Sequence, residues 1–84
     1  MRLWIENIAP GTNNEEILGL VQKYAPELTC GSIMRVEGAG SRPGALLQLT
    51  GGTISSAEDL STRLSGMYWK QRGLVCCMIG TFER

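Results

Sequence analysis

The stretch that decides the fold comes at the start of the chain and reads Leu3-Trp4-Ile5-Glu6-Asn7-Ile8. Aliphatic side chains alternate here with side chains of other kinds, and successive side chains of a β-strand point to opposite faces of a sheet. We therefore expect Leu3 and Ile5 to enter a core, while Trp4 stands on the opposite, open face. An aromatic ring held on an open sheet is a platform for stacking.

The composition is that of one folded domain. The chain has 84 residues, 43% of them hydrophobic, and no uninterrupted apolar run approaches the roughly 20 residues that a membrane-spanning helix needs. Arg2 and Glu6 interrupt any apolar segment of a secretory signal. We expect a single domain over residues 1–84, with its core at about 2–79 and a short tail at 80–84, in an intracellular, cytoplasmic location.

Catalysis and metal binding find few suitable side chains. The sequence has no histidine and no Cys-x-x-C spacing, and two of its three cysteines, Cys76 and Cys77, are neighbours that a strand points to opposite faces. Four acidic residues at expected helix starts serve as caps and dipole partners: Glu15, Glu16, Glu58 and Asp59. We predict a non-enzymatic protein with no catalytic residue, cofactor, metal or small-molecule substrate.

Two amphipathic helices are predicted from capping-box patterns. Thr12 and Glu15 open the first, whose apolar residues recur at helical spacing until a proline ends it. Ser55 and Glu58 open the second, and Gly66 is its expected C-cap. The apolar faces are Ile17, Leu20, Val21 and Tyr24 in the first helix, and Ala57, Leu60 and Leu64 in the second.

Three further strands are predicted at residues 33–36, 44–49 and 74–79. The order of elements is then strand, helix, strand, strand, helix, strand, which is the arrangement of the ferredoxin-like α+β fold. Right-handed crossovers place the first and third strands in the middle of a four-stranded antiparallel sheet, with two helices on one face. Trp69, just ahead of the last strand, is expected to fill the edge of the core.

The stretches 3–8 and 42–49 resemble the hexamer and octamer motifs of the RNA recognition motif (RRM) family. In the hexamer, Trp4 stands at the family's stacking position and Asn7 at its usual asparagine. In the octamer, Arg42 fits the basic lead position, whereas Gly44 and Leu46 stand where the family carries two exposed aromatic side chains. The match continues at Gly66, Trp69, Arg72, Leu74 and Cys76.

This resemblance implies a small module that binds single-stranded RNA on the open face of its sheet. The implied RNA-binding residues are Arg2, Trp4, Arg42, Leu46, Gln48 and Arg72. Binding is expected to be weak, because two octamer aromatics are absent and each base stacked on an aromatic contributes about 1 to 3 kcal/mol. Eight Lys and Arg also balance eight Asp and Glu, whereas phosphate contacts supply most non-specific affinity for nucleic acid.

The same face could instead bind protein. If the last strand turns Leu74 and Cys76 inward, as the resemblance implies, the open face becomes more apolar than a soluble monomer usually exposes. Its apolar side chains are then Trp4, Leu46, Val75, Cys77 and Ile79. A protein partner, a second copy of the chain, or the tail with Phe82 would cover it. The intact hexamer favours RNA, whereas the neutral charge and the missing octamer aromatics favour protein.

Overall fold

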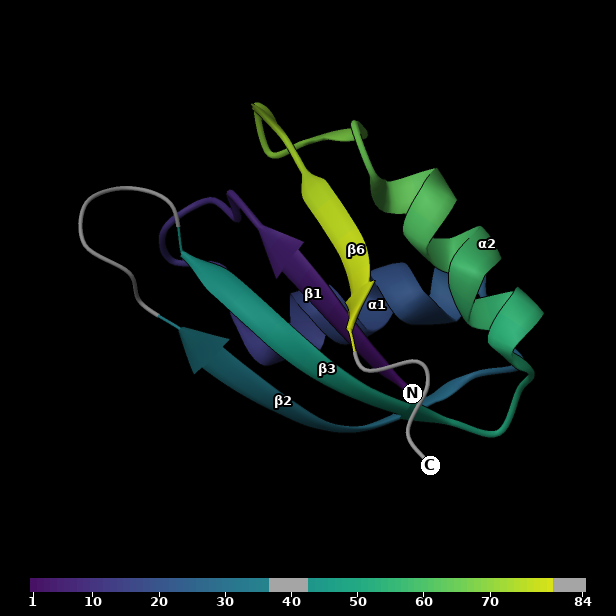
Figure 1. Cartoon of the computed structure of the whole chain (residues 1–84). Helices are drawn as coiled ribbons and strands as arrows, with labels where there is room; N and C mark the ends of the chain where they lie inside the picture. The colour runs from purple at the N-terminus through teal and green to yellow at the C-terminus, as the bar shows by residue number, and fades with distance from the viewer. Residues whose placement is uncertain (37–42, 80–84) are drawn as a thin grey trace.

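The protein is built around a four-stranded antiparallel sheet (Figure 1). The structure is a computed structural model that describes residues 1–36 and 43–79. The strands β1 (Arg2–Glu6), β2 (Thr29–Val36), β3 (Gly44–Thr50) and β6 (Val75–Ile79) lie in the order β2-β3-β1-β6. The helices are α1 (Asn14–Tyr24) and α2 (Ile54–Leu64), and a separate hairpin consists of β4 (Tyr68–Trp69) and β5 (Arg72–Gly73). The predicted ferredoxin-like α+β arrangement, with the first and third long strands in the middle, is confirmed.

The central strand β1 divides its side chains between two faces as its sequence predicts. Leu3 and Ile5 are almost fully buried, whereas the residues between and beside them are only partly buried. In the register of the sheet, Trp4 lies opposite Leu46 of β3 on one side and Cys77 of β6 on the other. Because strand side chains alternate with a period of two, these three residues share one face.

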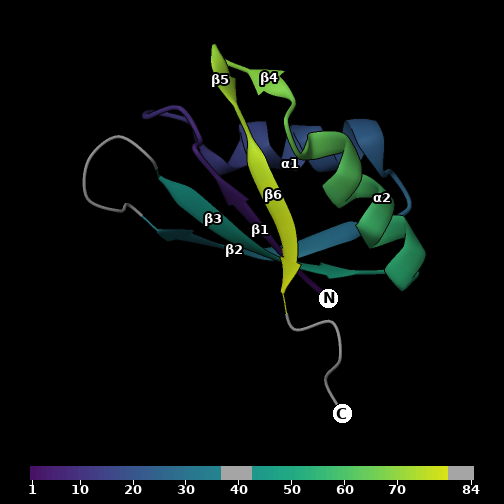
Figure 2. The ribbon, with the colours of Figure 1, turned by 45° about the horizontal axis from the view of Figure 1, so that its top comes forward.

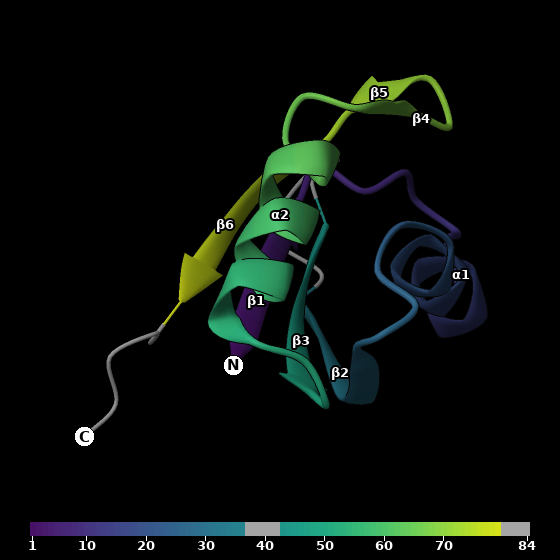
Figure 3. The same cartoon turned by 90° about the vertical axis from the view of Figure 1, so that its right-hand side faces the viewer.

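The hydrophobic core lies between the sheet and the helices, which leaves the opposite face of the sheet open. In Figure 1 that open face is toward the viewer with α1 behind it, and Figure 3 gives the view from the side. Most of the predicted helix faces are buried, namely Ile17, Leu20 and Val21 in α1 and Ala57, Leu60 and Leu64 in α2, and Tyr24 packs partly buried against the core. From the sheet and its approaches come Leu3, Ile5, Ala45, Leu47, Leu49, Leu74 and Cys76.

The first helix begins one residue later than predicted. Its capping box joins Asn13, whose side chain accepts from the Glu16 backbone N–H at 2.8 Å, to Glu16, whose carboxylate accepts from the Asn13 backbone N–H at 3.0 Å. The predicted box of Thr12 and Glu15 is wrong. The Thr12 hydroxyl instead donates to the carbonyl of Ala9 at 2.6 Å, which closes the preceding turn.

The second helix also begins elsewhere than predicted. Its N-cap is Thr53, whose hydroxyl oxygen accepts from the Ser56 backbone N–H at 3.1 Å, so the predicted cap at Ser55 is wrong. Glu58 lies beyond the first turn, which contains no acidic residue, and it does not complete a capping box. Gly66 follows the C-cap residue with a left-handed φ of 84°, the conformation that favours glycine after a helix.

Two features of the strands were not predicted. β2 begins at Thr29 rather than at residue 33, and its register shifts between Cys30 and Ser32, where a bulge interrupts the alternation. The hairpin of β4 and β5, which extends beyond the start of β6 in Figure 2, turns at Lys70 and Gln71 with φ of 54° and 68°. Such turns are recognised by Gly or Asn, so this sequence carries no signal for one.

Some sequence expectations lie outside the described residues. These are the octamer position Arg42 and the tail at 80–84 with Phe82. Among residues 1–36 and 43–79, no helix is long and apolar enough to cross a membrane.

The cap of α2 gives a direct test. We expect Thr53→Ala to lower the free energy of unfolding by about 1 kcal/mol, because the hydroxyl satisfies a backbone N–H of the first helical turn. Ser55→Ala is the matched control and should cost nothing, since Ser55 is exposed within that turn and alanine is the best helix former. Urea denaturation measures both values. A loss for Ser55→Ala with none for Thr53→Ala would reinstate the cap predicted from sequence.

Candidate functional site

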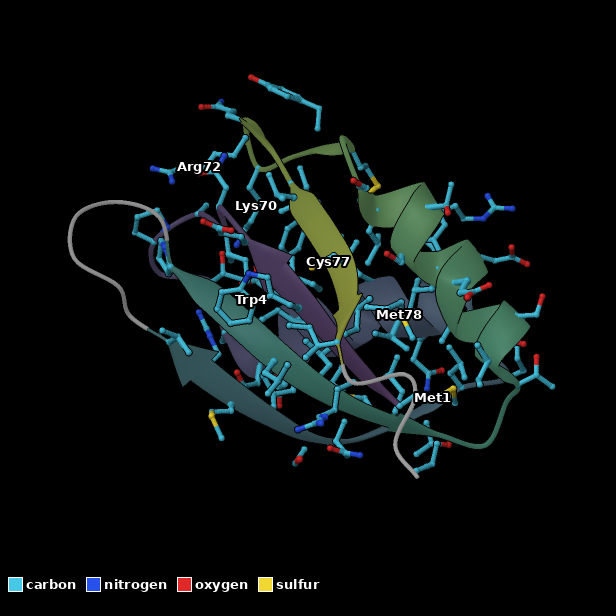
Figure 4. All side chains as sticks on the ribbon, viewed as in Figure 1. Met1, Trp4, Lys70, Arg72, Cys77 and Met78 are labelled. Atoms are coloured by element: carbon cyan, nitrogen blue, oxygen red, sulfur yellow. The ribbon has the colours of Figure 1, made fainter. Side chains whose placement is uncertain are left out.

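A row of four apolar side chains crosses the open face of the sheet. The register aligns Met34 of β2 with Leu46 of β3, Trp4 of β1 and Cys77 of β6. Met34 is 61% exposed and Cys77 is exposed, whereas Leu46 and Trp4 in the middle are half-buried. We call these four residues the apolar row. In Figure 4 the Trp4 ring lies in front of the sheet, over β3.

Further apolar side chains lie at the edges of the sheet on either side of the apolar row. One neighbouring row contains Gly44 and Glu6 and ends at Val36 and Val75. The other contains Gln48 and Arg2 and ends at Ile79. Val36, Val75 and Ile79 are all exposed. Leu74 and Cys76 are buried on the helix side, as expected. Apolar side chains therefore reach both edges of the open face, and the polar side chains of Glu6, Arg2 and Gln48 lie in the rows beside the apolar row.

The ring of Trp4 lies over Gly44. A β-carbon added at Gly44 would stand 2.5 and 2.6 Å from Cη2 and Cζ2 of Trp4, closer than real side-chain atoms approach. The neighbouring ring nitrogen Nε1 donates to the Glu6 carboxylate at 3.4 Å. Because Glu6 and Gly44 face each other in the register, the side of the indole that carries Nε1, Cζ2 and Cη2 lies over that pair of residues. The ring thus leans away from the apolar row, toward the start of β3.

Asn7 ties the end of β1 to the hairpin. Its φ is 66°, a left-handed conformation that asparagine tolerates better than most residues. Its side-chain amide donates to the carbonyl of Gly73 at 3.0 Å, and its amide oxygen accepts from a guanidinium N–H of Arg72 at 3.1 Å. The asparagine of the hexamer therefore positions the guanidinium of Arg72 at the end of the sheet where β1 stops (Figure 4).

The hairpin is also held to the start of α1. Lys70 Nζ lies 2.8 Å from a carboxylate oxygen of Glu16 and 3.4 Å from the Thr12 hydroxyl. The hydrogen bond from Lys70, with that from the Asn13 backbone, lowers the pKa of Glu16. Trp69, next to the turn of the hairpin, packs against the core as expected, and the Lys70 ammonium lies 5.5 Å from the centre of its ring. Lys70 thus serves to anchor the hairpin.

The structure gathers most of the residues predicted for the site on adjacent strands. Arg2 lies opposite Gln48, one row away from Trp4 and Leu46. Arg72 is separate from them, because it belongs to the hairpin strand β5 and reaches the end of the sheet through Asn7. Arg42 lies outside the described residues.

The contribution of β2 to this face was not predicted. Met34 and Val36 stand on it, next to Leu46 and Gly44 respectively. The signal was present, because alternation within residues 33–36 turns these two side chains away from Ile33, which packs against the core.

Two of the three thiols are poorly suited to nucleophilic chemistry. Burial raises the pKa of the Cys76 thiol to about 11 and also raises that of Cys30, so neither thiol is activated as a nucleophile. All three cysteines are free. Residues 1–36 and 43–79 contain no group of three Cys, Asp or Glu side chains that could hold a metal ion, and they enclose no pocket. The open face is a surface on which a ligand can lie.

Comparison with known proteins supports the fold. No family model matches the sequence, and no curated protein matches it. Among solved structures, RRM3 of Pes4 matches with a TM-score of 0.76 and 18% identity, over 99% of this chain and 95% of that chain. The RRM3 domain of Mip6 matches with a TM-score of 0.72 and 16% identity, over 90% and 89% of the two chains. The likeness shows that the chain has the fold of these RRM domains.

Two substitutions separate the effect on stability of the left-handed backbone at Asn7 from the effect of its side-chain hydrogen bonds. Asn7→Gly removes the bonds to Arg72 and Gly73 but keeps a residue that adopts positive φ freely. Asn7→Ala removes the same bonds but keeps a β-carbon, whose steric cost in that conformation glycine avoids. We expect both variants to be less stable than the wild type, and Asn7→Ala to be less stable than Asn7→Gly by about 1 kcal/mol. Thermal and urea unfolding measure the order, and equal stability of the two variants would contradict it.

Proposed function

We propose that the open face of the sheet binds single-stranded RNA and that one base stacks on Trp4. The proposed RNA-binding residues are Arg2, Trp4, Arg42, Leu46, Gln48 and Arg72. On this proposal the protein is a binding module that works without a cofactor or metal and catalyses no reaction.

The observation that carries the proposal is the position of the Trp4 ring. It lies on the open face next to the middle of the apolar row, supported from below by the backbone at Gly44, and remains partly exposed. Stacking of a base on such a ring contributes about 1 to 3 kcal/mol and tolerates any base, because every base has a flat π-face. The fold that the chain shares with the RRM3 domains of Pes4 and Mip6 supports the same proposal.

The side chains around the ring suit a nucleotide. Arg2 lies on the same strand two residues before Trp4, and Arg72 lies beyond the other end of that strand, so cations stand on both sides of the ring to meet phosphates. Gln48, in the same row as Arg2, offers an amide that both donates and accepts hydrogen bonds. Leu46 offers apolar contact to a base or ribose.

The charges of the chain and of the residues near Trp4 limit the affinity for RNA. The formal net charge of the chain is zero, so only a local group of cations can neutralise phosphates. Glu6, whose carboxylate accepts from the Trp4 ring nitrogen, places a negative charge beside the stacking surface. We therefore propose weak binding that decreases as the salt concentration rises.

Substitution of each tryptophan separates binding from stability. We expect Trp4→Ala to weaken binding of a random short single-stranded RNA by about 1 to 3 kcal/mol with little loss of stability, since the ring lies outside the core. Trp69→Ala should do the reverse, because Trp69 packs against the core. Fluorescence anisotropy and thermal unfolding give the two quantities. Binding by Trp4→Ala that equals that of the wild type would refute the proposal.

A second candidate function is association with protein through the same face. The observation that favours it is the exposure of Met34, Val36, Val75 and Ile79, which extend the apolar surface to both edges of the sheet. A base stacked on Trp4 would leave these edge residues uncovered. A protein partner or a second copy of the chain would bury them, and apolar burial contributes about 25 cal/mol per Å².

A charge introduced on the open face tests this second function. We expect Leu46→Lys to abolish any self-association without lowering the melting temperature, because Leu46 stands on the open side of β3. Gln22→Lys is the control, since it adds the same charge at an exposed position of α1. Analytical ultracentrifugation at high protein concentration measures association. A wild type that stays monomeric would exclude the homodimer, and equal association of both variants would place the interface elsewhere.

A further inference from the structure

The missing side chain at position 44 creates the place in which the Trp4 ring lies. Gly44 is on the open face, two residues before Leu46 on the same strand, yet it is buried because the indole covers it. Any β-carbon at this position would stand 2.5 Å from the ring, whereas ordinary contacts of such atoms begin at 3.4 Å. The ring must therefore move by roughly 1 Å or rotate away when residue 44 carries a side chain.

The direction of the ring follows from the same contact. From its own position in the apolar row, Trp4 could extend toward either end of β1. It leans toward the row that contains Glu6 and Gly44, where Nε1 meets the carboxylate of Glu6 at 3.4 Å. That bond is long and weak, so it cannot hold the ring by itself. The flat backbone at Gly44 supplies the surface against which the ring lies.

From these contacts we propose that Gly44 is a positioning residue for RNA binding, because it allows the Trp4 ring to lie on the sheet with one π-face against backbone and the other available to a base. The inference rests on the proposed function. Gly44 does not contact the RNA base in this arrangement, and it acts through the ring.

The proposal makes a specific prediction for an aromatic side chain at position 44. An aromatic residue at position 44 adds stacking surface to an open face on which Trp4 is the one aromatic side chain among the described strand residues, yet here the new ring would take the place of the Trp4 ring. Gly44→Phe should therefore weaken RNA binding when Trp4 is present. In the Trp4→Ala background the place is vacant, and the same substitution should strengthen binding, because the new ring stacks in place of the lost one.

The test measures the affinity of a fluorescein-labelled random single-stranded RNA of about eight nucleotides, a length within the usual site size of one domain. Gly44→Ala and Gly44→Phe are made in the wild type and in Trp4→Ala. We expect both substitutions to weaken binding in the wild type, by about 5- to 150-fold if the whole stack is lost. In Trp4→Ala, Gly44→Ala should have no effect and Gly44→Phe should raise the affinity.

Two controls separate positioning from general strain. The added β-carbon would also stand 3.1 Å from the backbone oxygen of Ile5, so some strain arises without the ring. Strain of that kind would weaken binding equally with and without Trp4, and this outcome would overturn the inference. Gly31→Ala is the matched substitution, since its β-carbon would meet nothing closer than the Gln48 carbonyl oxygen at 3.9 Å, and it should change nothing.

Spectra of the proteins without RNA complete the test. The indole N–H signal of Trp4 should shift in Gly44→Ala while the signals of core methyl groups stay in place, which shows a moved ring in a folded domain. Should Gly44→Phe fail to fold, Gly44→Ala decides the matter alone. Unchanged affinity and an unchanged indole signal in Gly44→Ala would overturn the inference. A wild type that does not bind the RNA would instead overturn the proposed function.

Discussion

Most of the structure depends on how strand β1 divides its side chains between the two faces of the sheet. Helices cover only one face, so alternate side chains of β1 enter the core and the open face. Its buried side chains, Leu3 and Ile5, join the core against the helices, and its remaining side chains form the middle of the open face. Both neighbouring strands are paired with it in register. A slip of one residue would exchange the two faces and expose the core residues, so the hydrophobic effect holds the register firmly.

The end of β1 connects this strand to parts of the molecule that are distant in sequence. Asn7 turns the backbone with a positive φ and binds β5, while Lys70 at the tip of the same hairpin pairs with Glu16 at the start of α1. Ion pairs that face solvent add little to stability, so the effect of this one is on geometry. Together these contacts place Arg72 at the edge of the open face.

The open face combines two properties that favour different ligands. Its apolar row suits either a nucleobase or a protein surface, because both bury apolar area on contact. Electrostatics distinguishes the two ligands. An RNA strand brings phosphates, which need cations such as Arg2 and Arg72 nearby, whereas the exposed apolar residues at the sheet edges gain only from a ligand broad enough to reach them. The position of the Trp4 ring favours the nucleobase.

The sequence by itself determined the order of the four long strands and the two helices, the buried face of each helix and the side of the sheet on which Trp4 stands, because these follow from local periodicity. It did not determine the capping residues, since Thr12 with Glu15 fits the capping box as well as Asn13 with Glu16 does, and Ser55 with Glu58 fits it better than Thr53, the cap that the structure uses. The hairpin at Lys70 was likewise absent from the local pattern, because it is held by Glu16, far away in the chain. Only the tertiary structure decided the use of Gly44, where two strands meet in register and the ring of Trp4 covers a residue that in sequence looked like a missing aromatic.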